Sequence, residues 1–284
     1  MNRFRITRGT EKRTLQDALA AHLTLSRNAA KRLIDARGVF VNGRRIWIAH
    51  HAVNTGDEIE VAGLPEKAGG ARASGAAPRP AAVAVLFRDA RYAVVDKPAG
   101  ILANGADSLE TRLQAEWNLP ALRAVHRLDR DTSGCLLFAC DQEARDKAIE
   151  VFEEKTVLKL YHAIAAGRVH GPTDTLNKSL DNLPAVTHLR VLDANDTASH
   201  LQIKLETGRT HQIRRHLSAI HHPVLGDRQY GLDAKLPDAF REIPRQMLHA
   251  ERLAMPHPFT SALLVARAPL PRDFRDWLRR LTLS

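Results

Sequence analysis

A charged loop directly before an apolar segment holds the residues best suited to chemistry. The run HRLDRDTSG at 126–134 sets two arginines and two aspartates beside a predicted turn, and the apolar run GCLLFAC follows. A carboxylate such as Asp129 can act as a nucleophile or as a base, but it can equally form a salt bridge on a surface loop. Asp131 is expected to serve the turn, and Thr132 and Ser133 to hydrogen-bond the same turn. The loop alone leaves both interpretations open.

The histidines do not predict a metal site. The chain has 14 of them, including His211 and His216, whose spacing of five residues does not match the four-residue spacing of a helical zinc pair. No cluster of cysteines or acidic residues completes a ligand set. We therefore expect no metal. His211 is expected to orient the segment that contains Arg214, and His126 to orient the loop around Asp129.

The overall charge points to a polyanionic partner. The formal net charge is +10 and the sequence pI is about 10.0, while 44% hydrophobic and 26% charged residues are values typical of globular proteins. A generally basic proteome is the alternative explanation. No long basic amphipathic helix with bulky apolar residues opposite is evident, which favours nucleic acid over an anionic membrane.

The cysteines and the first residues indicate a cellular compartment. Cys135 and Cys140 stand five positions apart in one predicted strand, so their side chains should point to opposite faces and not pair. We expect two buried thiols in a reducing compartment. The start, MNRFRITRGTEKR, has no apolar core of a signal peptide, and no apolar run approaches the roughly 18 residues of a membrane span. A cytoplasmic protein is expected.

Composition divides the chain into two domains. Residues 64–82, GLPEKAGGARASGAAPRPA, are rich in glycine, alanine and proline and lack periodic apolar positions, as is typical of a flexible linker. The linker separates a domain at 1–63 from a larger one at 83–284.

The larger domain mixes short strands and helices. Its strand-like runs are AVLFRD, YAVVDKP, GCLLFAC, KLYHAIAAGRV, SHLQIKLETG, QMLHAERLAM and SALLVARAP. Helices are expected at 108–117, 142–153, 211–220 and 273–282. The strands come in uneven clusters rather than in strict alternation with helices. This pattern predicts an α+β fold with a largely antiparallel central sheet.

The smaller domain resembles the S4 RNA-binding module. Thr14 with Asp17 can cap one helix, and Ser26 can cap a second at 27–36. The run GVFVNGRRIWI then carries a hairpin signal at Asn42-Gly43. A helix pair followed by a basic "VNG" hairpin is what resembles the module. The resemblance implies RNA binding, largely through phosphates and shape, by Arg27, Lys31, Arg32, Arg44 and Arg45.

The larger domain resembles the RluA-type RNA pseudouridine synthases. HRLDRDTSG resembles their signature loop, and HRLD rather than GRLD favours this type over the RsuA type. Four further runs resemble family motifs in the expected order: VVDKPAG at 94–100, KLYHAIAAG at 159–167, LETGRTHQIRRHLSAIHHPVLGDRQYG at 205–231 and QMLHAERLAMPHP at 246–258. The resemblance covers about 83–268 and implies the pseudouridine synthase fold, with the S4-like piece as an N-terminal extension.

The resemblance also implies roles for single residues. Asp129 matches the catalytic aspartate, Tyr161 the tyrosine of the YxA motif, and Arg214 the basic residue that pairs with the aspartate. Arg127 matches an arginine that helps to occupy the space left by the displaced nucleotide. Other residues predicted to position the RNA or the base are His126, Arg209 and His211.

The implied reaction explains these residue types. Conversion of uridine to pseudouridine breaks the N1–C1′ bond, rotates the uracil and rejoins it through C5. Nothing is added, removed or oxidised, so no cofactor or metal is required. The carboxylate could attack C1′, attack C6 or remove the 2′ proton, and these routes stay open. Arg214 is expected to keep the carboxylate ionised, and Tyr161 to assist loss of the C5 proton or to stack on the base.

The expected function is that of an isomerase acting on structured RNA. We expect the target to be large-subunit (23S) ribosomal RNA, with transfer RNA as the alternative and with the protein acting as a monomer. A non-catalytic RNA-binding or ribosome-assembly factor on the same scaffold is the second hypothesis. An N-glycoside hydrolase that uses the same aspartate is the third, and free uracil among its products would reveal it.

Overall fold

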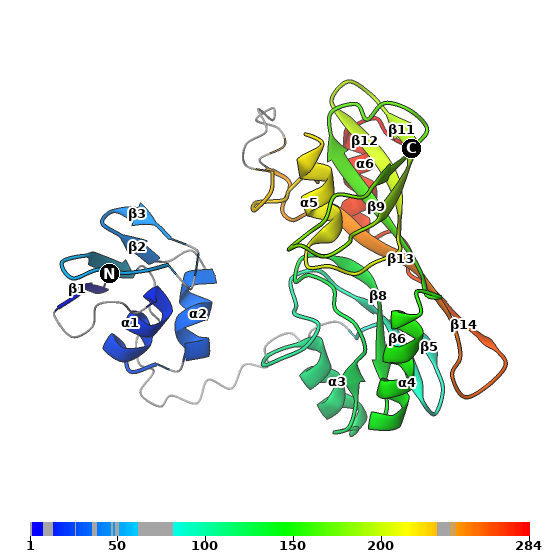
Figure 1. Ribbon diagram of the computed structural model, residues 1–284, viewed down its shortest axis with the longest axis horizontal. Helices are drawn as coiled ribbons and strands as arrows, with labels where there is room; N and C mark the ends of the chain where they lie inside the picture. The colour runs from blue at the N-terminus through cyan, green and yellow to red at the C-terminus, as the bar shows by residue number, and fades with distance from the viewer. Residues whose placement is uncertain are drawn as a thin grey trace. The chain divides into compact units, whose positions relative to one another are not determined.

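The chain folds into two compact units, Met1–Arg79 and Pro80–Ser284 (Figure 1). The division falls inside the predicted linker, of which only Ala82 belongs to the described residues, so the bounds of the linker stay a prediction. The computed structural model describes residues 2–7, 14–25, 27–35, 39–46, 48, 51–61, 82–231, 240 and 242–284.

The smaller unit packs two helices against a four-stranded sheet of order β1-β4-β2-β3. Its elements are β1 (Asn2–Arg5), α1 (Leu15–His22), α2 (Arg27–Asp35), β2 (Val39–Val41), β3 (Arg44–Arg45) and β4 (Glu58–Val61). Thr14 caps α1 as predicted, since its side chain accepts from the Asp17 N–H at 3.3 Å. The predicted hairpin joins β2 to β3, with φ of 50° at Asn42 and 74° at Gly43. Positive φ at both central positions is what a two-residue hairpin turn requires.

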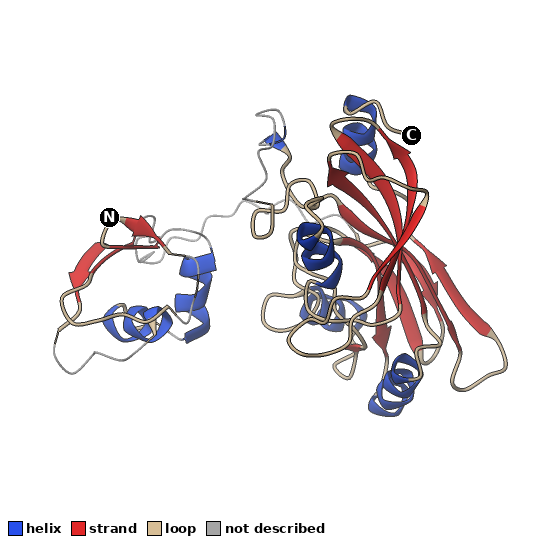
Figure 2. Cartoon of the chain, turned by 45° about the horizontal axis from the view of Figure 1, so that its top comes forward, coloured by secondary structure: helices blue, strands red, loops and turns tan. Residues whose placement is uncertain are grey.

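The larger unit is built on a ten-stranded sheet (Figure 2). Its strands are β5 (Val85–Arg88), β6 (Tyr92–Lys97), β7 (Arg123–Ala124), β8 (Ser133–Ala139), β9 (Leu158–Ala166), β10 (Thr173–Leu176), β11 (Thr187–Ala194), β12 (Ala198–Leu205), β13 (Leu248–Pro256) and β14 (Leu263–Arg267). Its helices are α3 (Leu109–Trp117), α4 (Gln142–Glu153), α5 (Gln212–Ala219) and α6 (Arg272–Arg280).

The sheet is largely antiparallel, as predicted. Its main path runs β10-β11-β12-β9-β13-β8-β6-β5, while β14 pairs with β13 and β7 with β8. Among the described strands, only β13 and β8 pair in parallel, at His249 with Ser133 and at Ala250 with Gly134. This pairing places the start of β8, and therefore the charged loop before it, against the start of β13.

Alternating side chains along the strands enter different cores. In β6 and β8, Val95 and Leu136 pack in the core that contains α3, whereas Val94 and Leu137 pack in the core that contains α4. At the other end of the sheet, α5 contributes Ile213 and Leu217 to the core that contains α3. The helix α6 packs in a separate core through Phe274. The period of two expected for a strand therefore gives the sheet two buried faces.

Some predicted details need correction. The strands β1, β4, β7, β10 and β11 were absent from the predicted set. Both cysteines are free as predicted, but only Cys135 is buried, because β8 ends at Ala139 and Cys140 lies beyond it, half-buried. Among the described helices, none is both long enough and apolar enough to span a membrane.

Candidate active site

One pocket in the larger unit collects the predicted site residues. Its volume is about 890 Å³ with the open mouth included. Seven residues that the sequence singled out line it: His126, Arg127, Asp129, Tyr161, Arg209, His211 and Arg214. They come from the loop before β8, from β9 and from the start of α5, so the sheet brings together segments that are far apart in the chain.

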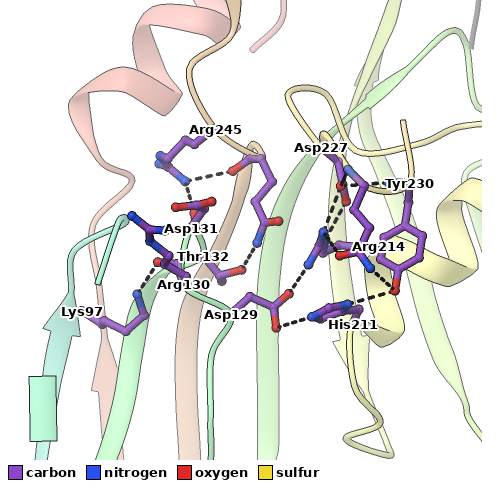
Figure 3. Close-up of polar contacts among 12 residues, drawn as sticks. Lys97, Asp129, Arg130, Asp131, Thr132, His211, Arg214, Asp227, Tyr230 and Arg245 are labelled. Atoms are coloured by element: carbon purple, nitrogen blue, oxygen red, sulfur yellow. Dashed lines mark hydrogen bonds and ion pairs between the residues drawn. The ribbon is translucent and has the colours of Figure 1, made fainter. Parts of the chain in front are cut away.

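Contacts from the segment around the start of β13 hold the loop that carries Asp129. The Gln246 side-chain amide donates to the Thr132 hydroxyl at 2.6 Å, and Ser133 hydrogen-bonds the His249 ring at 2.9 Å. Arg245 donates to the Asp131 carbonyl at 3.2 Å (Figure 3). The turn is closed by the Thr132 N–H, which donates to the Asp129 carbonyl at 3.1 Å, whereas the hydroxyls of Thr132 and Ser133 find their partners in Gln246 and His249.

Gly134 allows this close approach. Its φ of 111° lies in the region that favours glycine, and a Cβ there would lie 2.2 Å from the Ala250 carbonyl oxygen. A side chain at this position would force β8 away from β13. The glycine that ends HRLDRDTSG therefore serves the packing of the loop.

A buried lysine ties the same loop to the turn after β6. Lys97 is fully buried, and its ammonium donates to the carbonyls of Pro98, Ile101 and Arg130 at 2.8, 2.8 and 2.9 Å. The carbonyls belong to both segments, so this one side chain joins them (Figure 3). Burial lowers the pKa of Lys97 to about 7, although the negative charge of Asp131 opposes the shift.

This lowered pKa predicts a pH dependence of stability. An unfolded chain would hold the Lys97 proton up to its ordinary pKa of about 10.4. Between pH 7 and pH 9 the unfolded state therefore binds more protons than the folded one. The free energy of unfolding should rise with pH by up to about 1.4 kcal/mol per unit. Urea unfolding at pH 7, 8 and 9 should show this rise in the wild type and not in Lys97→Met; equal slopes would contradict it.

Arg214 joins Asp129 to a second, buried aspartate. Its Nη1 donates to Asp129 Oδ2 at 2.8 Å, while Nε and Nη2 donate to the two oxygens of Asp227 at 2.5 and 2.9 Å. The Asp227 side chain is 0% exposed and that of Asp129 is 18% exposed. Burial disfavours the guanidinium charge, but the hydrogen bonds and charges of the two aspartates outweigh it and raise the pKa of Arg214. Arg214 is thus a fixed cation that orients Asp129.

The start of α5 adds a histidine beside the carboxylate. His211 has a left-handed φ of 53°, and its Nε2 lies 3.6 Å from Asp129 Oδ1 while its Nδ1 hydrogen-bonds the Tyr230 hydroxyl at 2.9 Å (Figure 3). Burial lowers the pKa of His211, although Asp129 opposes this shift. His211 therefore faces Asp129, and not only the segment of Arg214 as the sequence suggested.

Tyr161 forms a wall of the pocket on β9. It is 8% exposed, and burial together with the negative charge of Asp129 raises the pKa of its hydroxyl above the ordinary value. The hydroxyl therefore stays protonated at neutral pH. None of the described residues hydrogen-bonds to this hydroxyl, and Tyr161 is one of the residues that line the pocket.

The remaining predicted residues, His126, Arg209 and Arg127, also line the pocket. His126 accepts from the Leu137 N–H at 3.2 Å and stacks on Phe152, and burial lowers its pKa to about 4, so the ring is neutral and attaches the loop to β8. Arg209 donates to the Pro184 carbonyl at 3.1 Å. Arg127 is exposed, which leaves it accessible to RNA.

The basic residues predicted for the smaller unit are described only in part. Arg27 and Lys31 are exposed on α2, and the Arg27 guanidinium lies 2.6 Å from the Asp17 carboxylate. The backbones of Arg32, Arg44 and Arg45 belong to α2 and β3, but their side chains lie outside the described residues.

Sequence reasoning missed Asp227, Tyr230 and Gln212. Gln212 accepts from the Arg209 N–H at 3.0 Å and donates to the Val186 carbonyl at 3.0 Å, which secures the loop before α5. A signal for Asp227 was present, since it is the single acidic residue between 207 and 231. Within the part of the chain that the structure describes, no group of three or more histidines, cysteines or acids is arranged to hold a metal ion.

Comparison with known proteins finds a matching family model in each of the two units. Residues 91–219 match the family model of the RNA pseudouridylate synthases, and residues 13–59 match that of the S4 domain. An uncharacterized RNA pseudouridine synthase of Bacillus subtilis, YhcT, is 32% identical over 82% of this chain and 86% of its own length. Ribosomal large subunit pseudouridine synthase D of Pseudomonas aeruginosa is 34% identical over 69% of this chain and 71% of its own.

A solved structure shares the fold of the larger unit. Human RNA pseudouridylate synthase domain containing 4 superimposes with a TM-score of 0.61 at 26% identity, over 71% of this chain and 94% of that chain.

Proposed function

The chain belongs to the RluA-type RNA pseudouridine synthases and carries an S4 domain, and from that premise we propose that Asp129 isomerises a uridine of large-subunit ribosomal RNA. The observation that carries the proposal is the arrangement of Asp129, Arg214 and Asp227 in one pocket. A carboxylate that a buried guanidinium holds in place stays oriented when a base covers it, as nucleophilic attack or proton removal requires.

The reaction assigns a task to each neighbour of Asp129. The target uridine leaves its stack and enters the pocket, which costs a few kcal/mol that phosphate contacts offset. Arg127, exposed at the rim, takes part of the vacated space in the RNA. Asp129 then acts at C1′, at C6 or on the 2′ proton, and all three routes begin from the same ionised carboxylate. Tyr161 supplies a neutral phenol against the base, while C5 loses its proton to water and the detached N1 gains one.

The choice of RNA rests on the relatives and on the S4 domain. Several relatives at 30–35% identity are named ribosomal large subunit pseudouridine synthase D. An S4 domain and a net charge of +10 suit structured RNA. The proposal includes a cytoplasmic enzyme that acts as a monomer. Transfer RNA remains the second candidate substrate.

Tritium release from RNA labelled at uracil C5 tests the function. Wild-type protein should release tritium from large-subunit ribosomal RNA of cells that lack the gene. Release from transfer RNA alone would change the assigned substrate, and no release from any cellular RNA would overturn the reaction. Mapping pseudouridines by carbodiimide-stop sequencing, with and without the gene, would identify the uridine.

The S4 domain is expected to contribute affinity rather than rate. Replacing its five predicted RNA-binding residues by glutamine should weaken RNA binding, and the slope of log K against log salt should fall by about 0.7–0.9 for each phosphate that is no longer neutralised. The single-turnover rate at saturating RNA should stay unchanged, because the catalytic residues lie in the larger unit. A lower rate with unchanged affinity would contradict this division. The replaced residues are Arg27, Lys31, Arg32, Arg44 and Arg45.

A further inference from the structure

A lysine lines the active-site pocket together with Arg127, Arg209 and Arg214, and no role has been assigned to it. Lys159 lies on β9, two residues before Tyr161, and is 9% exposed. Its ammonium lies 5.8 Å from the centre of the Phe152 ring. Within the described ranges, neither a carboxylate nor a hydrogen-bond acceptor pairs with it.

The other buried cations of this unit are all satisfied. Lys97 donates to three carbonyls, Arg214 to two aspartates, and Arg245 to Asp273 and to backbone carbonyls. A buried charge without a partner costs free energy, and burial is what lowers the pKa of Lys159. Apart from the Phe152 ring, none of the described residues compensates the charge of Lys159, which indicates a partner that enters the pocket.

We propose that Lys159 binds a backbone phosphate of the nucleotide that enters the pocket. The inference rests on the proposed function, in which that nucleotide is a uridine of RNA. A phosphate supplies the full negative charge and the acceptor oxygens that an unpartnered ammonium requires. The exposed Arg127 lines the same pocket, so two cations would face the sugar-phosphate chain.

The surroundings of Lys159 favour the phosphate over the uracil ring. The Lys159 ammonium lies 5.8 Å from the centre of the Phe152 ring, on which His126 stacks. The Asp129 carboxylate has other neighbours, Arg214 and His211. By each of the three routes the reacting atoms of the uridine must sit at Asp129, and its phosphates lie several bonds away from them.

Substitution of Lys159 in a catalytically inactive background gives the test. The probe is large-subunit ribosomal RNA transcribed in vitro, and Kd is measured over a range of salt for Asp129→Asn alone, with Lys159→Met and with Lys159→Arg. Lys159→Met should raise Kd roughly 10-fold and reduce the salt slope by about 0.7–0.9. Lys159→Arg keeps the charge and should restore most of the affinity and most of the salt slope. Lys159→Met should also resist urea at least as well as its parent, because it removes an unpaired buried charge.

Each other outcome overturns the phosphate site. An unchanged Kd and salt slope for Lys159→Met would exclude it. An unchanged Kd with a slower single-turnover rate, measured in the Asp129 enzyme, would place the cation on the uracil instead. Loss of stability without rescue by Lys159→Arg would make Lys159 structural. Binding does not require turnover, so failure of the proposed function appears separately, as absence of tritium release by the wild type.

Discussion

Replacing Asp129 by asparagine is expected to reduce tritium release by at least roughly 10⁴-fold, the scale seen when a residue that performs the chemistry is removed. Asparagine has nearly the same shape and can still accept from Arg214, so the pocket should remain intact. It cannot act as a nucleophile or a base. RNA affinity should survive within a few-fold, because the phosphate contacts do not involve this side chain. Release kinetics and a binding isotherm on the same preparation measure both.

The matched control lies two residues along the same loop. Asp131 is exposed, and its contact with Arg245 is made by the backbone carbonyl rather than the carboxylate. Asp131→Asn should therefore retain activity within a few-fold. Equal losses in the two variants would mean that charge in the loop, and not chemistry at Asp129, supports the reaction. Growth rescue of a gene-deletion strain by Asp129→Asn would favour the non-catalytic RNA-binding factor.

Replacing Asp227 by asparagine is expected to impair both stability and catalysis. Asp227 is fully buried and holds Arg214 through two hydrogen bonds. Loss of one member of a buried ion pair costs about 3–5 kcal/mol, which urea unfolding should detect. The Arg214 guanidinium would also be without the carboxylate that fixes its direction toward Asp129. Tritium release should then fall even under conditions in which the variant is folded.

The neighbouring arginine of α5 supplies the control. Arg215 donates to both oxygens of Asp181 at 2.8 and 3.1 Å, but the Asp181 side chain is 67% exposed. Both pairs join an arginine to an aspartate, but the Asp227 carboxylate is buried and the Asp181 carboxylate is exposed. Asp181→Asn should change unfolding and tritium release little, because exposed ion pairs contribute little to stability. A similar effect of both substitutions would show that burial of Asp227 is not what matters.

Local sequence patterns were sufficient for much of the fold. Short runs rich in apolar residues predicted β6, β8, β9 and β12 within a few residues of their ends. Thr14 and the Asn42-Gly43 turn act through contacts within a few residues of chain, so their geometry follows from local sequence. The polar strand β10, with its exposed residues, gave no apolar signal, and the sequence analysis missed it.

The sequence by itself determined which residues could perform the chemistry and in what order they occur, because the motif at Asp129 and those at Tyr161 and Arg214 are runs of neighbouring residues. Only the tertiary structure decided how they are held. Asp129 and Arg214 are 85 residues apart, and Gln246 reaches Thr132 across 114 residues. Such contacts depend on strand order and on the parallel pairing of β13 with β8, which no local pattern encodes. Burial is likewise a property of the assembled sheet, and it alone distinguishes Asp227 from Asp181. It also makes Lys159 a buried cation, one that pairs with no acid among the described residues.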